Sequence, residues 1–91
     1  MLFQIDYIMT TVIKQSKKAH YIVYSVSGDE VLWHYLGNDL FDASDAYDEE
    51  RRELISNYCE GDNITLVFKN NWTNRVEYSF NTLKDIYNGR N

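Results

Sequence analysis

The sequence predicts an α+β domain in which an antiparallel sheet of about five strands, in the order βββ-α-ββ-α, carries one amphipathic acidic helix and a short C-terminal helix. Two pairs of segments alternate apolar and polar residues as strands do, and a turn sequence separates the members of each pair. Between these pairs, one segment repeats its apolar residues with a helical period. The 91 residues fit a single domain over 1–91, because two cores of half that size would be too small to fold alone.

The first predicted strand covers residues 2–14. Apolar and polar side chains alternate in its first half, and its second half contains a β-branched run from Thr10 to Ile13. A basic turn follows, with Lys14, Lys17 and Lys18. We therefore expect this strand to end before residue 20.

A tight hairpin is predicted from residue 20 to residue 36, because Gly28-Asp29 suits the positive φ angles of a two-residue turn. This turn sets three expected cross-strand pairs: Val26 with Val31, Tyr24 with Trp33, and Ile22 with Tyr35. The register places the rings of Tyr24, Trp33 and Tyr35 on one face and Val23, Leu32 and Leu36 on the other. Both faces are partly apolar, so one is expected to cover the helix and the other to lie under a loop or to meet a second copy.

The one clear helix is predicted over residues 43–59. Its apolar side chains share one side at about 100° per residue; they are Tyr47, Leu54 and Tyr58, with Ile55 beside them. The opposite side gathers carboxylates at Asp42, Asp45, Glu49, Glu53 and Glu60. We expect Asp42 or Ser44 to cap the start of the helix and Gly61 to end it.

Residues 64–69 and 75–80 form the second predicted hairpin, across the loop 70–74. The apolar residues of one face match across it; they are Ile64, Leu66 and Phe68 on one strand and Val76, Tyr78 and Phe80 on the other. Asn81 is expected to cap a short helix from Thr82 to Tyr87, which Gly89 ends. The sequence leaves the order of the strands in the sheet open.

The charge of the chain is concentrated in one segment. Nine of the fourteen acidic residues lie between Asp39 and Asp62, where only Arg51 and Arg52 oppose them, whereas the remaining residues are slightly basic. Four of these acids recur every three or four residues, which projects their carboxylates as a row with spacings of about 5–6 Å; they are Asp42, Asp45, Glu49 and Glu53. Such a row resembles a phosphate backbone. A solvated face with Asp48 or Glu49 paired to Arg52 is the alternative.

We therefore expect a small non-enzymatic interaction protein. It would act as an inhibitor or decoy whose acidic helix engages the basic groove of a nuclease or another nucleic-acid-binding protein. A phage- or plasmid-encoded antagonist of a host defence such as a restriction or CRISPR system, or an immunity protein against a nuclease toxin, fits this description by analogy of charge and size. The expected contact residues are Asp42, Asp45, Asp48, Glu49 and Glu53, with Tyr47 and Trp72 as apolar anchors.

Two other kinds of binding protein are alternatives. A homo-oligomeric assembly protein would form a homodimer through Tyr24, Trp33 and Tyr35 of the first hairpin. A small RNA or single-stranded DNA binder would need a basic surround for its aromatic rings, and only the lysines at 14, 17 and 18 offer one. The net charge of −5 opposes direct binding to nucleic acid.

We expect no catalytic residues, metal or cofactor. Cys59 is the only cysteine, which rules out an internal disulfide; with His20 or His34 as base it lacks a third group for nucleophilic catalysis. The two histidines have no metal-ligand spacing, and no glycine-rich phosphate loop is present. No apolar stretch reaches the roughly 18 residues of a membrane span, and residues 1–9 lack the features of a signal peptide. A cytoplasmic protein is expected.

Overall fold

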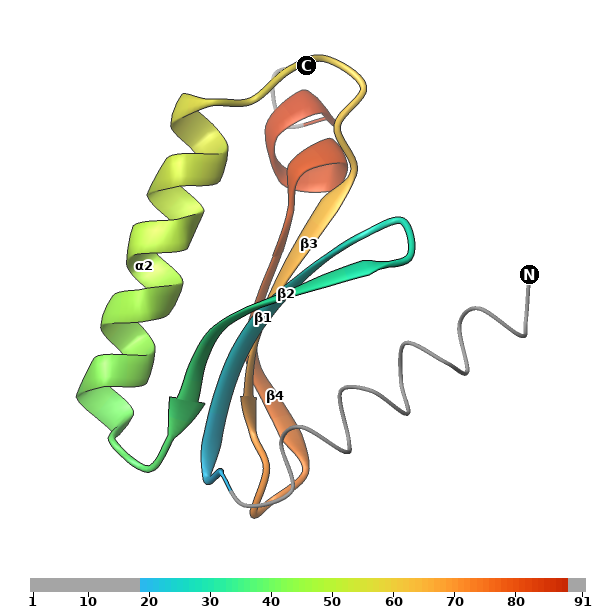
Figure 1. Ribbon diagram of the computed structural model, residues 1–91. Coiled ribbons are helices and arrows are strands. Elements are labelled where there is room, and N and C mark those ends of the chain that lie inside the picture. Colours follow the sequence, from blue (N-terminus) through green and yellow to red (C-terminus); the bar gives the residue numbers. More distant parts are fainter. Residues whose placement is uncertain (1–18, 89–91) are drawn as a thin grey trace.

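The computed structural model describes residues 19–88, which form one antiparallel sheet with a main helix and a short helix (Figure 1). The strands are β1 (Tyr21–Ser27), β2 (Glu30–Gly37), β3 (Ile64–Asn70) and β4 (Arg75–Asn81); the helices are α2 (Leu40–Ser56) and η1 (Thr82–Tyr87). The predicted α+β class is confirmed. The strand predicted over 2–14 lies outside the described residues, within which the sheet has four strands, so a fifth stays a prediction.

The sheet has the strand order β2-β1-β3-β4, which the sequence left open. Because β1 pairs antiparallel with both β2 and β3, these two strands run in the same direction on either side of it. The helix α2 connects β2 to β3 and packs on one face of the sheet (Figure 1). The edges of the sheet within 19–88 are β2 and β4.

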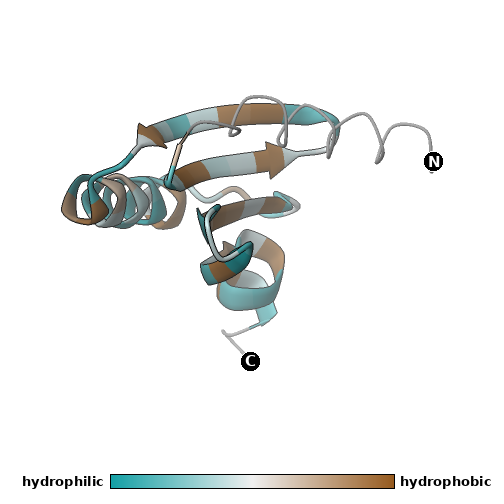
Figure 2. Ribbon diagram, turned by 90° about the horizontal axis from the view of Figure 1, so that it is seen from below, coloured by the Kyte–Doolittle hydropathy of each residue, from teal (hydrophilic) through white to brown (hydrophobic). Residues whose placement is uncertain are grey.

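Apolar residues alternate with hydrophilic ones along the strands (Figure 2), and each face of the sheet has its own cluster. The cluster under α2 contains Val23, Leu66, Phe68 and Phe80 from the strands, Ala43 and Tyr47 from α2, and Ile86 from η1. The cluster on the other face contains Ala19, Ile22, Tyr24 and Val67, with Val26, Val31 and Trp33 packed against it. The helix therefore belongs to the larger core, and its position depends on the few residues that it contributes there.

The first hairpin confirms the predicted turn, with Gly28 at φ 62°, and the predicted pairs Val26–Val31 and Tyr24–Trp33. The predicted Ile22–Tyr35 pair is wrong, because Tyr35 faces Val23 and Leu36 faces Ile22. Residue 34 is an extra residue in β2, a β-bulge that turns the rest of the strand over. The rings at 33 and 35 therefore lie on opposite faces of the sheet, not on one.

The second hairpin is present as predicted, and in it Leu66 faces Phe80 and Phe68 faces Tyr78. Val76 faces Lys69, because Glu77 is an extra residue in β4. This second bulge removes Val76 from the face on which the sequence placed it. Bulges therefore interrupt both edge strands, which is a common protection of sheet edges against unwanted pairing.

The helix begins and ends a few residues earlier than predicted. Its N-cap is Asp39, whose carboxylate accepts the N–H of Asp42 at 2.9 Å, so neither Asp42 nor Ser44 caps it. Its end is closed by Asn57, whose backbone N–H and side-chain amide both donate to the carbonyl of Glu53, at 3.0 and 3.1 Å. Gly61 adopts φ 98° in the loop beyond the helix instead of ending it.

A hydrogen bond with a side chain of the edge strand β2 sets the first residue of α2. The hydroxyl of Tyr35 accepts the backbone N–H of Asp39 at 3.0 Å. To reach it, the Tyr35 ring lies across Gly37, where a Cβ atom would overlap the ring. Several Asp and Ser residues in this segment could serve as the N-cap. The contact with Tyr35 favours the first of them, Asp39. Because the helix starts there, the side of its first turn that packs on the sheet is also determined.

The short helix η1 has the predicted bounds, and the side chain of Asn81 caps it by accepting the N–H of Lys84 at 2.8 Å. Its hydrogen bonds are of the wider π-helical type. The buried Thr82 hydroxyl donates to the carbonyl of Asp62 at 3.0 Å and accepts the N–H of Ile64 at 2.9 Å. These bonds join the end of β4 to the loop that follows α2.

Replacement of the N-cap tests this account of the helix start. Asp39→Ala should lower the free energy of unfolding by about 1 kcal/mol, because an N–H of the first turn loses its acceptor. Ser44→Ala, at a site that the sequence made an equal candidate, should change it by less than about half of that. Urea denaturation followed by circular dichroism measures both. Equal losses in the two variants would contradict the assignment of the cap.

Two buried tyrosines predict a loss of stability at alkaline pH. Burial raises the pKa of the Tyr24 hydroxyl above its ordinary value of 10.0, and burial is also the largest cause of the raised pKa of Tyr47. The folded state therefore holds these protons longer than the unfolded state does, so stability is full below about pH 10 and falls as the pH rises through the raised pKa values.

Urea denaturation at several pH values between about 8 and 11 measures this loss. Tyr24→Phe and Tyr47→Phe should each reduce the alkaline loss, because they remove a group that ionises more easily in the unfolded chain. Tyr87→Phe, at an exposed position, is the matched control. The same alkaline loss in all three variants would contradict the prediction.

Candidate partner-binding surface

The five acidic residues predicted as contacts with a partner all lie on α2 and are all exposed; they are Asp42, Asp45, Asp48, Glu49 and Glu53. Within residues 19–88, the one ion pair with an N–O distance of 4.0 Å or less joins His34 Nδ1 to Glu50 Oε2, at 3.7 Å. The alternative in which Arg52 pairs with acids of the same face is thus absent from this part of the chain. These carboxylates face solvent without a close cation from residues 19–88.

The two arginines of α2 do not neutralise this row of acids. The guanidinium of Arg51 lies over the ring of Phe80 in β4, 5.2 Å from the ring centroid, which is a favourable cation–π arrangement. Its charge is directed toward the sheet. Arg52 is exposed and has no carboxylate within 4.0 Å among the described residues. The acidic side of the helix therefore keeps most of its negative charge.

An acidic groove of about 470 Å³ runs along one flank of α2, below its last turns. Its lining includes the carboxylate-bearing residues Glu49, Glu50, Glu53 and Asp62, together with Leu54, Asn57 and Ile64. A smaller hollow of about 190 Å³ beside it is lined by His34, Ala46 and the same three glutamates of α2. The acidic surface thus extends from the solvent-facing side of the helix into the groove and the hollow beside it.

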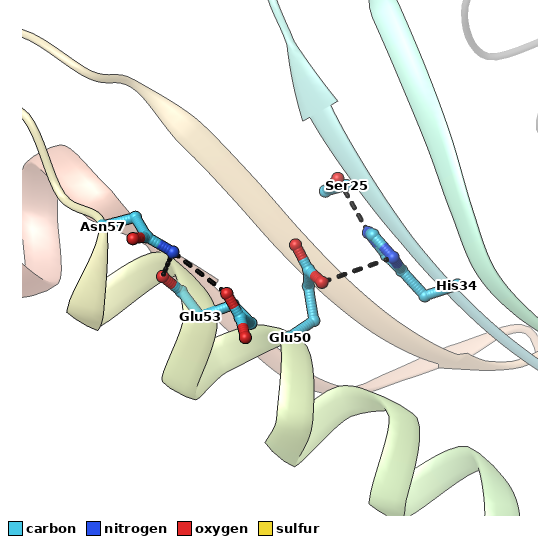
Figure 3. A network of polar contacts seen from close by, with 5 residues as sticks. All are labelled: Ser25, His34, Glu50, Glu53 and Asn57. Atoms are coloured by element: carbon cyan, nitrogen blue, oxygen red, sulfur yellow. Dashed lines mark hydrogen bonds and ion pairs between the residues drawn. The ribbon is translucent and has the colours of Figure 1, made fainter.

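A chain of polar contacts links this flank to the sheet (Figure 3). Nε2 of His34 lies 2.9 Å from the hydroxyl oxygen of Ser25, and Nδ1 of the same ring lies 3.7 Å from the carboxylate of Glu50. His34 points to the face of α2 because it follows Trp33, which packs on the other face, and a strand without the bulge would also place it there. The sequence could not predict the contact with Glu50, because this contact depends on how α2 lies against β2.

The order Ser25, His34, Glu50 is the order of groups that activates a nucleophilic serine in hydrolases. Ser25, however, is only 4% exposed and lies in β1, an inner strand whose backbone N–H groups serve the ladders to both neighbours. No pair of free N–H groups is left there to hold an oxyanion. The acids of the adjoining hollow would also repel a developing negative charge. The contacts hold α2 against the edge strand.

The two predicted apolar anchors differ in exposure. Tyr47 is 7% exposed and belongs to the core under α2, so it offers little surface to a partner. Trp72 is 73% exposed in the loop between β3 and β4. One face of its ring stacks on His20, with a centroid distance of 3.7 Å and an interplanar angle of 8°, and the backbone N–H of Asn71 donates to the carbonyl of His20. Trp72 is thus held in place while its other face stays accessible.

Sequence reasoning missed two exposed aromatic residues on the other flank of α2. Phe41 in the first turn of the helix is 79% exposed, and Tyr78 in β4 is 61% exposed. Both line a hollow of about 360 Å³ between α2 and β4, and Tyr78 also lines a smaller one of about 160 Å³. Tyr78 shares a strand face with Phe80, which predicts a core residue, but α2 leaves most of its side chain uncovered. Phe41 precedes the predicted start of the helix, so no face was assigned to it.

The other candidate residues are dispersed. Tyr24 is buried with its ring 5.6 Å from that of Trp33, and Tyr35 lies on the opposite face. Cys59 is exposed, with its Sγ 3.7 Å from the carbonyl oxygen of Asn57. Lys14, Lys17 and Lys18 lie outside the described residues.

Residues 19–88 contain neither a candidate metal site nor a candidate membrane-spanning helix. No group of three or more His, Cys, Asp and Glu residues is arranged to hold a metal ion there. No helix of that part combines the length and the apolar character that a bilayer span requires.

Comparison with protein-family models, with curated proteins and with solved structures finds no match to this chain. Function is therefore inferred from the surface of α2 and its two flanks.

Neutralising part of the acidic row should stabilise the free protein. Asp45 and Glu49 are four residues apart on α2, and like charges at this spacing destabilise a helix by about 0.2–0.5 kcal/mol. The double variant Asp45→Asn, Glu49→Gln should therefore raise the free energy of unfolding by a few tenths of a kcal/mol at low salt. The gain should disappear in about 1 M salt.

The matched control is Glu50→Gln, which removes a carboxylate that contacts His34 and should therefore show no such gain. Chemical denaturation at low and high salt measures all three proteins. A destabilised double variant would mean that these two carboxylates are engaged within the molecule.

Proposed function

We propose that this protein is a non-enzymatic interaction protein that binds a basic protein partner through the exposed acids of α2. Four of them, Asp42, Asp45, Glu49 and Glu53, are called the carboxylate row below. The observation that carries the proposal is that the row is exposed and has no cationic group within 4.0 Å among residues 19–88. Uncompensated charge of this kind costs stability in the free protein. A cationic surface that contacts the row would recover that cost.

The spacing of the row suits a groove that normally holds nucleic acid. At a rise of 1.5 Å per residue, its carboxylates follow one another at roughly 5.5 Å along the helix axis, whereas one strand of DNA carries a phosphate every 3.4 Å or so. The row is therefore somewhat less dense than one strand. Because it is fixed on a helix that both Asp39 and Asn57 cap, little conformational entropy is lost when a partner binds it.

This surface supports an inhibitor or decoy of a nuclease or another nucleic-acid-handling protein. The proposed class comprises phage- or plasmid-encoded antagonists of host defence, such as restriction or CRISPR systems, and immunity proteins against nuclease toxins. Small size and concentrated charge support this class by analogy. Homo-oligomeric assembly through the first hairpin is less well supported, because Tyr24 is buried and Tyr35 lies on the face opposite to Trp33.

Charge reversal with a matched control tests the proposal. The wild-type protein and the variant Asp45→Lys, Glu49→Lys are immobilised and used to capture proteins from host lysate at low and high salt. The control variant Asp29→Lys, Glu30→Lys reverses two exposed acids at the hairpin turn, which projects away from α2 (Figure 1), with the same change in net charge. The protein captured by the wild type should be lost with the α2 variant, retained with the control, and released by salt.

The captured protein is then purified, and its affinity for the three proteins is measured by calorimetry. Reversing the two acids should weaken binding by at least tenfold, or about 1.4 kcal/mol. Equal binding by the α2 variant and the control would sink the proposal. A captured protein with an acidic or neutral contact surface would do the same.

A further inference from the structure

A groove lined with aromatic rings and carboxylates lies between α2 and β4, on the flank opposite to the His34 contacts. It consists of two adjoining hollows of about 360 and 160 Å³, which share Phe68 and Tyr78 in their lining. Phe41 and Glu77 belong to the larger hollow and Asp48 to the smaller. We call it the aromatic groove.

Tyr78 in this groove is 61% exposed, but its ring is held in place. The ring of Tyr78 meets that of Phe68 edge to face, at a centroid distance of 5.9 Å and an angle of 74°, and lies 5.8 Å from that of Tyr47. Phe41 beside it is 79% exposed. Large apolar side chains that are exposed together mark binding surfaces. A ring that is already fixed, as that of Tyr78 is, loses little entropy when a ligand packs on it.

The carboxylates of the groove restrict the chemistry of its occupant. Asp48 and Glu77 have no cationic group within 4.0 Å among residues 19–88. A purely apolar side chain would remove water from them without supplying a hydrogen bond, which is costly. A lysine ammonium would pair with them but is compact and strongly hydrated, so it gains less from the rings. A guanidinium is planar, stacks on aromatic faces and donates to carboxylates, so it fits both features.

The molecule itself contains one such contact beside this groove. The guanidinium of Arg51 lies over the ring of Phe80, 5.2 Å from its centroid. One turn earlier on the helix the position is Asp48, and two residues earlier on the strand the ring is Tyr78. Arg51 and Phe80 thus form a pair of a cation and a ring. At the neighbouring positions, the same helix and strand carry Asp48 and Tyr78, a pair of a carboxylate and a ring. A cation from another molecule would complete the second contact as Arg51 completes the first.

We propose that the aromatic groove binds an arginine side chain of the basic partner. The aliphatic stem and the plane of the guanidinium lie against Tyr78 and Phe41, and its N–H groups donate to the carboxylates of Asp48 and Glu77. The inference rests on the proposed function, because it assigns to the same partner a specific side chain next to the carboxylate row. The row then supplies long-range attraction, and the groove supplies selection of arginine over other residues.

The direct test uses three short peptides and the ¹⁵N-labelled protein in NMR titrations. The peptides are acetyl-Gly-X-Gly-amide with arginine, lysine or citrulline at X. The arginine peptide should give saturable shifts at the amides of Phe41, Asp48, Glu77 and Tyr78. Lysine should bind several-fold more weakly, because it stacks less well. Citrulline, which keeps the shape of arginine without its charge, should give no saturable shift.

Variants of the groove distinguish its two components. Asp48→Asn with Glu77→Gln should weaken binding of the arginine peptide roughly threefold to tenfold, as expected for two exposed ion pairs. Tyr78→Leu should weaken it by roughly threefold through loss of the aromatic face. Leu32→Ala and Glu30→Gln alter an exposed apolar residue and an exposed acid of the first hairpin, and should leave binding unchanged. The spectrum of each free variant shows whether it is folded.

Three results would overturn the inference: equal binding of the arginine and citrulline peptides, shifts confined to the acidic groove of Glu49, Glu53 and Asp62, or no saturable shift at all. These results leave the proposed function intact if reversal of Asp45 and Glu49 still abolishes capture of the partner. Conversely, arginine binding in the groove without any effect of that reversal would separate the groove from the proposed function.

Discussion

The packing of one stripe of α2 on the sheet determines which way the acids of this protein point. Ala43 and Tyr47 are buried between the helix and the strands, and Leu54 packs against the same cluster. On a helix, residues three and four positions apart share a side, so burial of these three sends Asp45 and Glu49 outward. The contact of Tyr35 with the first turn fixes the same rotation from the edge of the sheet. A change in that stripe would redirect the acids as a set.

The exposed acids of α2 lower the stability of the free protein, because they repel one another. Arg51 lies on another side of the helix and packs over Phe80, and the one close ion pair of α2 within residues 19–88 is that of Glu50 with His34. Mutual repulsion among carboxylates on a helix is small for each pair but adds along a row. A free-standing domain gains nothing from this repulsion. A surface that meets a cationic partner gains steering and specificity from it.

The fold followed from the sequence wherever one local signal was decisive. The Gly28-Asp29 turn predicted the first hairpin and the alternation of Leu66 and Phe68 predicted the second, because each signal sets the pairing next to it. The bulges at His34 and Glu77 were invisible, because a polar residue in an alternating strand looks the same whether or not it is an extra residue. The acidic row could be predicted from spacing alone. The aromatic groove and the contact of His34 with Glu50 could not, because each depends on how α2 lies across the sheet.

Carboxyl footprinting tests the central claim most directly. Solvent-accessible carboxylates are coupled to an amine with a carbodiimide, and the rate at each residue is measured by mass spectrometry for the free protein and for its complex with the basic partner. We expect Asp45 and Glu49 to react rapidly in the free protein and slowly in the complex, with Asp29 and Glu30 of the hairpin turn reacting rapidly in both. Slow reaction of Asp45 and Glu49 in the free protein, or unchanged reaction in the complex, would contradict the account.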